Sequence, residues 1–329
     1  MITILQSSFI FRPGEVTPSC HAATLVETTA GDVLATWFGG TDEGAPDVAI
    51  YLARFTGEAW GTPQKIADQE GVPLWNPVLF RAADGGLWLF YKVGPTIPAW
   101  TGCCLFSRDD GRSWSAPSAL PAGLLGPAKN KPITLQNGDI LSPTSAETWR
   151  SWSAWVELSR DGGLNWTRHG PITAPPAPPS EESEPFSAEF RGVIQPAIWE
   201  SSPNRLRMLL RATRPVGWVC LSDSEDGGRT WSAARATGVP NPNSGIDAVR
   251  LKNRRVVLVC NPVHAERSPL SLLVSNDNGE TWPERTDLED GPGEYSYPSI
   301  MQSADGKIHL VYTWRRETIC HVVLADQPD

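Results

Sequence analysis

Six polar residues of differing chemistry precede a small residue or a proline at similar intervals along the sequence. They comprise a histidine, a lysine, a carboxylate, two amides and a tyrosine, at His21, Asn76, Lys131, Gln195, Asp247 and Tyr297. Each lies within a strand-like run. If equivalent positions of a repeated fold converge, such a set can bind hydroxyl groups, transfer protons and supply a nucleophile. A merely hydrated channel would need no particular set, so the variety favours a binding or catalytic site.

A second group of polar residues follows about one strand later. The segment 39–47 is rich in glycine and acidic residues, includes Asp47, and has the composition of a mobile site loop or of a solvated turn. We expect the strands that follow to bring further binding groups to the same mouth, at Lys92, Arg211, Asn261 and Arg315.

The elements that must position these groups are marked by a repeated motif. Ser-x-Asp-x-Gly-x-x-Trp occurs at 107–114, 159–166, 224–231 and 275–282, each time after an apolar run. The Asp can accept hydrogen bonds from turn N–H groups, the Gly allows a positive φ, and the Trp can pack over the returning strand. The motif therefore predicts a hairpin turn that recurs once per structural unit.

The spacing of these motifs, about 50 residues, fits one four-stranded unit per repeat. Strand-like runs dominate, and no segment sustains a helical apolar period. We predict an all-β fold, a six-bladed β-propeller, as a single domain over residues 1–329. The run 2–11 should complete the last blade, which otherwise has strands only at 297–302, 307–314 and 318–324. The proline-rich insert 175–185 should be a stiff exposed loop.

Composition excludes several classes of partner. The net charge is −9 and basic clusters are absent, which argues against nucleic acid and anionic membrane surfaces. No run of 18 apolar residues occurs, and the first residues lack the features of a signal peptide, so we expect a cytoplasmic location. A carbohydrate partner is favoured, and nothing indicates an oligomeric state.

Neither a metal site nor a cofactor is expected. The five histidines show no ligand spacing with one another or with cysteine. The chemistry would therefore rest on side chains alone.

The repeated motif resembles the Asp-box, or BNR repeat, of the sialidase superfamily. The resemblance spans nearly the whole chain and implies a six-bladed propeller. It also implies a glycosidase with a tyrosine nucleophile, a glutamate that activates it, an aspartate acid/base and three arginines that grip the carboxylate of sialic acid.

On this resemblance Tyr297, within the run 294–300, is the nucleophile and Asp47 is the acid/base. Arg211 is one of the arginines, and Arg315 or Arg316 is another. The sequence departs from the pattern twice: Cys20 and His21 stand where the first arginine is expected, and Gln195 stands where the glutamate is expected. Asp247, in the next blade, is the candidate substitute for the glutamate.

Three functions remain open from the sequence. The leading one is a sialidase-like glycoside hydrolase that acts on an acidic or highly hydroxylated sugar. A lyase on a uronic-acid glycan would use His21 or Tyr297 as base and Lys92 and Lys131 to neutralise the carboxylate. A non-catalytic carbohydrate-binding propeller would carry the same turn motifs.

Overall fold

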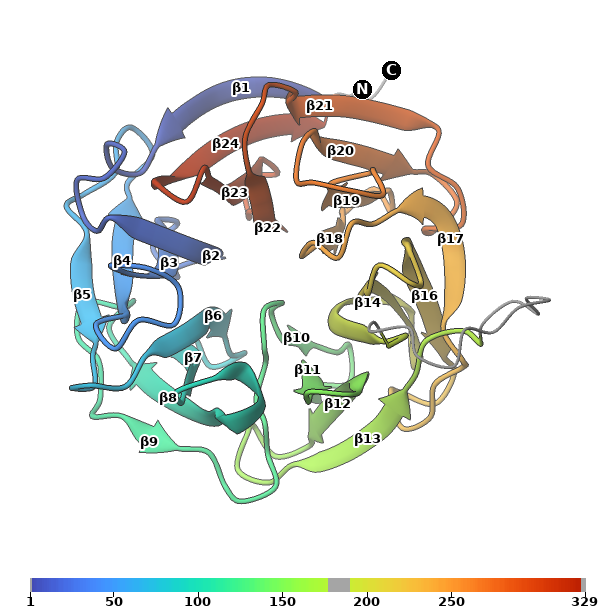
Figure 1. Cartoon of the computed structure of the whole chain (residues 1–329). Coiled ribbons are helices and arrows are strands. Elements are labelled where there is room, and N and C mark those ends of the chain that lie inside the picture. Colours follow the sequence, from blue (N-terminus) through green and yellow to red (C-terminus); the bar gives the residue numbers. More distant parts are fainter. Residues whose placement is uncertain (1, 177–189, 327–329) are drawn as a thin grey trace.

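The computed structural model describes residues 2–176 and 190–326, so most of the proline-rich insert lies outside the described residues. Six four-stranded antiparallel sheets are arranged around a common axis as a six-bladed β-propeller (Figure 1). The all-β prediction is confirmed.

The first strand of each blade is innermost and the last is outermost. Blade one comprises β2 (Ser19–Glu27), β3 (Val33–Gly40), β4 (Ala49–Phe55) and β5 (Gln64–Ala67). Blade two comprises β6 (Leu74–Arg81), β7 (Leu87–Val93), β8 (Thr101–Ser107) and β9 (Ser118–Ala119). Blade three comprises β10 (Ile133–Thr134), β11 (Ile140–Glu147), β12 (Trp152–Ser159) and β13 (Thr167–Ile172). Blades four and five comprise β14 (Val193–Ser202), β15 (Arg205–Ala212), β16 (Trp218–Ser224) and β17 (Arg235–Pro240); and β18 (Asp247–Arg250), β19 (Val256–Cys260), β20 (Leu270–Ser275) and β21 (Glu284–Glu289).

The sixth blade is completed by the first strand of the chain. β22 (Tyr295–Gln302), β23 (Ile308–Trp314) and β24 (Thr318–Asp326) form three of its strands, and β1 (Ile2–Phe9) pairs antiparallel with β24. The register runs from Ile2 opposite Asp326 to Phe9 opposite Cys320. The predicted closure of the ring by the N-terminal run is therefore confirmed.

The Ser-x-Asp-x-Gly-x-x-Trp turns join the third strand of a blade to the fourth. In the first of them, Ser107 Oγ donates to Asp109 Oδ1 at 2.8 Å and accepts from Gly111 N at 2.8 Å. Asp109 Oδ1 also accepts from Ser113 N at 2.9 Å. The Asp and Ser side chains thus satisfy N–H groups within the turn, and they lie on the outer strands, away from the axis.

Apolar residues fill the space between adjacent blades. One such cluster joins Leu34 and Ile50 of blade one to Leu87 and Leu89 of blade two, and Tyr297 packs at its edge. The only helix among the described residues is the 3-10 turn η1 (Ile97–Ala99). It has neither the length nor the apolar character needed to cross a bilayer.

Candidate functional site

The inner strands of four blades are bulged where they approach the mouth of the propeller. The pairing registers skip at Ala22, Asn76, Gln195 and Tyr297, and all four residues have a positive φ between 43° and 55°. Such a conformation is uncommon for residues other than glycine, and a bulge re-aims the side chain. The bulges thus point Asn76, Gln195 and Tyr297 differently from their neighbours along each strand.

This register corrects one part of the predicted ring. His21 is not equivalent to Asn76, Gln195 and Tyr297, because the bulged residue of β2 is Ala22. Lys131 precedes β10, and Asp247 begins β18 without a bulge. A shift of one residue moves a side chain to the opposite face of its strand. Aligning the inner strands by the small residue or proline that follows each polar residue therefore placed His21 one residue out of register.

Tyr297 lies at the mouth among charged and polar side chains. Its side chain is largely buried, and its hydroxyl accepts a hydrogen bond from Arg211 Nη1 at 2.6 Å. The ring centres of His21 and Tyr297 are 4.1 Å apart. The guanidinium carbons of Arg211 and Arg267 each lie 5.5 Å from the centre of the tyrosine ring. Two cations and a histidine therefore surround the phenol.

Arg211 is bound by neutral groups. Its Nε donates to Asn243 Oδ1 at 2.9 Å, and Nη1 also donates to Gln195 Oε1 at 3.1 Å. The centre of the Trp152 ring lies 5.6 Å from the guanidinium carbon of Arg211. Arg211, Trp152 and Arg267 line a cavity of about 340 Å³ beside the phenol. Among the described residues no carboxylate is hydrogen-bonded to Arg211, so its charge is not neutralised by a direct ion pair there.

His21 cannot replace a guanidinium. The imidazole is 1% exposed and its Nδ1 is 3.0 Å from Thr313 Oγ1. Burial, together with the nearby Arg316, Arg267 and Arg211, lowers the pKa of His21 well below its ordinary value. The ring is therefore neutral at physiological pH and can only exchange hydrogen bonds.

Two further arginines reach the mouth from loops. Arg267 Nη1 contacts Glu294 Oε1 at 2.6 Å, and Arg316 Nε contacts Glu294 Oε2 at 3.1 Å. Arg316 also pairs with Glu43 of the acidic loop. Arg267 was missed by the sequence analysis, because nothing in the loop between β19 and β20 marks its direction.

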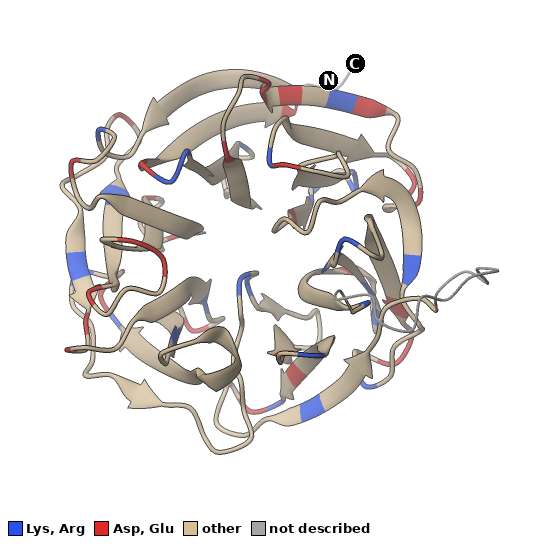
Figure 2. Cartoon of the chain, in the orientation of Figure 1, with Lys and Arg blue, Asp and Glu red and all other residues tan. Residues whose placement is uncertain are grey.

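Asp47 lies on the acidic loop between β3 and β4, where the ribbon of Asp and Glu residues is red in Figure 2. Its Oδ2 accepts from Thr41 Oγ1 at 2.6 Å and from Thr41 N at 3.0 Å. The Thr41 hydroxyl and amide lower the pKa of Asp47 below its ordinary value. The Glu43–Arg316 pair joins this loop to the mouth, but no contact among the described residues links Asp47 to Tyr297.

Asp247 and Lys131 bind each other. Lys131 Nζ donates to Asp247 Oδ2 at 2.7 Å, and Ile300 N donates to the same oxygen at 2.8 Å. Asp247 Oδ1 accepts from its neighbour Ala248 N at 2.9 Å. Among the described residues, none of these bonds reaches Tyr297; the carboxylate joins the inner strands of blades five and six to the segment that precedes β10 of blade three.

The segment before β10 projects into the centre of the ring (Figure 1). Lys129, which sequence analysis missed, is 1% exposed and donates to Asn130 Oδ1, Ile246 O and Pro298 O. Asn130 Nδ2 donates to Gln195 O at 2.8 Å. Burial lowers the pKa of Lys129 to about 7, although Asp247 opposes the shift. This segment connects four blades across the axis.

The remaining predicted residues are less directly placed for chemistry. Lys92 is buried and donates to Leu125 O and Gly126 O, and Asn261 donates to Pro269 O and Tyr295 O. Arg315 stacks on Trp314, with its guanidinium carbon 4.6 Å from that ring. Asn76 is 6% exposed at its bulge. Among the described residues, no group of three His, Cys, Asp or Glu side chains could hold a metal ion.

Comparisons with known proteins agree with this architecture. Residues 31–310 match the model of the BNR repeat-like domain family. A sialidase of Bacteroides fragilis is 23% identical over 224 residues, which are 63% of this chain. The chain covers only 38% of the length of that relative.

Solved structures share the fold at low identity. A protein of unknown function from Dyadobacter fermentans has a TM-score of 0.80 at 18% identity, with 99% of each chain covered. The NanB sialidase from Streptococcus pneumoniae, solved with a chlorobenzylammonio-ethanesulfonate, has a TM-score of 0.76 at 14% identity. That match covers 97% of this chain and 70% of the other.

These matches favour neither the lyase nor the binding module. The family match covers most of the chain, and the six-bladed fold agrees with it. The chain therefore belongs to the BNR repeat-like domain family, within the sialidase superfamily.

Proposed function

We propose that this protein is a sialidase-like glycoside hydrolase that acts on an acidic sugar at the mouth of the propeller, with Tyr297 as nucleophile. The observation that carries the proposal is the hydrogen bond from Arg211 to the Tyr297 hydroxyl, beside a cavity lined by three arginines, Arg211, Arg214 and Arg267. The sialidases among the similar proteins support the same class of substrate.

A tyrosine suits this substrate for electrostatic reasons. A phenolic oxygen approaches an anionic sugar with less repulsion than a carboxylate does. Attack on the anomeric carbon requires the phenol to lose its proton to solvent water, and the guanidinium of Arg211 stabilises the negative charge left on that oxygen; Arg267 lies over the same ring. The neutral His21 packs against the phenol and helps to fix its orientation.

Asp47 is the proposed acid/base. An acid that protonates a leaving group must hold its proton near neutral pH, whereas the Thr41 bonds favour the ionised form of Asp47. Release of Asp47 from Thr41, with the carboxyl facing the leaving group, raises its proton affinity. Substrate binding would therefore have to rearrange the loop between β3 and β4.

Turnover of two fluorogenic glycosides tests the proposal. We expect the protein to release methylumbelliferone from the N-acetylneuraminic acid glycoside and not from the galactoside. Tyr297→Phe should lower kcat at least about 10³-fold, because the nucleophile is lost. Tyr295→Phe, on the same strand, should retain the wild-type rate. Equal turnover by the Tyr297→Phe variant, or cleavage of the galactoside alone, would contradict the assignment.

A further inference from the structure

Glu147 is a buried carboxyl group that the proposed mechanism does not use. It ends β11, and its residue is 7% exposed. Its Oε1 is buried and has no hydrogen-bond partner among the described residues. An unpaired buried carboxylate is costly, so such a group is either kept protonated or placed beside a cation.

Strand geometry places Glu147 beside the site. In the β11–β12 ladder Glu147 is opposite Trp152, which lies 5.6 Å from the guanidinium carbon of Arg211. Ser145, two residues earlier and therefore on the same face of β11, accepts from Gln195 N at 2.8 Å. Trp152 therefore packs against Arg211 directly, and Ser145 is linked to it through Gln195.

Two cations from other blades, Arg211 of β15 and Lys92 of β7, act through their charge to lower the pKa of Glu147. Burial outweighs them and raises the pKa of Glu147 to about 7. Lys92 is itself held by two backbone carbonyls, whereas Arg211 faces the phenol and the cavity.

We propose that Glu147 is a positioning residue that controls how much of the positive charge of Arg211 is available to an anionic sugar. When its carboxyl is protonated, no acid in the described part of the chain is hydrogen-bonded to Arg211, which then holds the anion firmly. When the carboxyl is ionised, it competes with the ligand for the field of Arg211. The choice of ligand rests on the proposed function, but the coupling between Glu147 and Arg211 does not.

The coupling can be measured without a ligand. The carboxyl of Glu147 is followed by carbon-13 NMR across a pH titration, in the wild type and in Arg211→Met. We expect a midpoint near 7 that moves upward when the guanidinium is removed. A midpoint near that of an exposed glutamate, or one that Arg211→Met leaves unchanged, would overturn the inference.

The consequence for binding is measured by calorimetry with N-acetylneuraminic acid. We expect wild-type affinity to fall about three- to tenfold between about pH 6 and about pH 8.5, as a nearby negative charge forms. Glu147→Gln should keep the affinity at the acidic value throughout. The control is Glu157→Gln: Glu157 is also buried in blade three beside Lys92, but accepts from Leu125 N and Gly126 N. That variant should retain the wild-type pH dependence.

The outcomes separate the two proposals. If N-acetylneuraminic acid fails to bind at every pH, the proposed substrate is wrong, and the NMR titration still decides whether Glu147 and Arg211 are coupled. If it binds and Glu147→Gln keeps the wild-type pH slope, the role of Glu147 is wrong while the substrate stands.

Discussion

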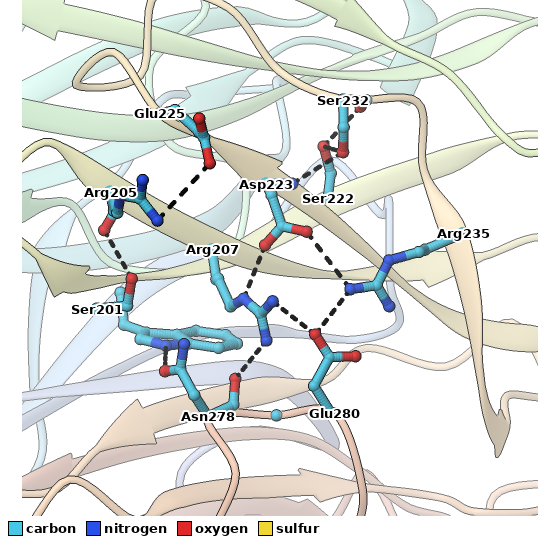
Figure 3. A network of polar contacts seen from close by, with 12 residues as sticks. Ser201, Arg205, Arg207, Ser222, Asp223, Glu225, Ser232, Arg235, Asn278 and Glu280 are labelled. Atoms are coloured by element: carbon cyan, nitrogen blue, oxygen red, sulfur yellow. Dashed lines mark hydrogen bonds and ion pairs between the residues drawn. The ribbon is translucent and has the colours of Figure 1, made fainter.

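Arginines are used in opposite ways at the mouth and at the outer edge of the propeller. At the edge, between blades four and five, Arg207 contacts Asp223 at 2.7 Å and Glu280 at 2.6 Å (Figure 3). Arg235 contacts the same two carboxylates at 3.4 and 3.0 Å. At the mouth, the hydrogen-bond partners of Arg211 within residues 2–176 and 190–326 are all neutral.

The difference lies in what remains for a ligand. The charge of Arg207 is used within the protein, where it joins two blades, and a partly exposed network of this kind gives modest stability. The charge of Arg211 is held in place by amides and a phenol, which fix its orientation without neutralising it. A count of arginines would not separate the two roles, but their partners do.

The largest difference between the two regions should appear when one arginine is removed from each. Arg211→Met should lower kcat/KM for the sialoside about 100-fold, since on the proposed function a buried charge that binds the substrate is lost. Arg207→Met should leave kcat/KM within about twofold and lower the free energy of unfolding by about 1 kcal/mol. Steady-state kinetics and urea unfolding measure both. A loss of activity in Arg207→Met as large as in Arg211→Met would show that the outer network also serves the site.

The pKa values of a carboxylate in each region are shifted in opposite directions, so their contributions to stability should change in opposite directions with pH. Burial raises the pKa of Glu147 from 4.5 to about 7, so its protonated form contributes stability below pH 4.5 that is lost as the pH rises through 7. Burial opposes the shift of Glu280, but Arg207 and Arg235 lower its pKa, so its contribution is present above pH 4.5 and lost in acid.

Urea unfolding from acidic to neutral pH measures this contrast. Relative to wild type, Glu147→Gln should gain stability as the pH rises, by at most about 3 kcal/mol. Glu280→Gln should be destabilised near neutral pH, with the difference shrinking in acid. Parallel pH curves for both variants would contradict the assigned environments.

The smallest effect is expected on the acidic loop. Thr41→Val removes the hydroxyl bond to Asp47 and keeps the backbone bond. The pKa of Asp47 should rise, as followed by NMR, and the alkaline limb of kcat/KM, where the acid loses its proton, should move the same way. Thr56→Val, at an exposed threonine of the loop after β4, is the control. An unchanged pKa of Asp47 would mean that the Thr41 hydroxyl does not hold the carboxylate.

Most of the fold could be predicted because one local signal recurs in each of several blades. The N–H groups of the turn are hydrogen-bonded by side chains of the motif itself, as at Ser107 and Asp109. The motif can therefore be recognised in the sequence without knowledge of distant contacts. The last blade was also predictable, since three strands after the final motif need a fourth, and β1 supplies it.

The site was predictable only in part, because its residues meet through long-range geometry. Tyr297, Arg211 and His21 were predicted and lie together. His21 was assigned to the wrong register, since the bulge at Ala22 leaves no mark in the sequence. Arg267 and Lys129 were missed because loops carry them, and loop direction depends on the packed blades around them.

The segment that carries Lys129 also limits what kind of glycan this mouth can accept. Lys129 spans from blade three to the carbonyls of Ile246 and Pro298, and Asn130 is bonded to Gln195. A polymer threaded along the axis would collide with this bridge. On the proposed function, a glycan would therefore have to reach Tyr297 and leave it on the same side of the bridge.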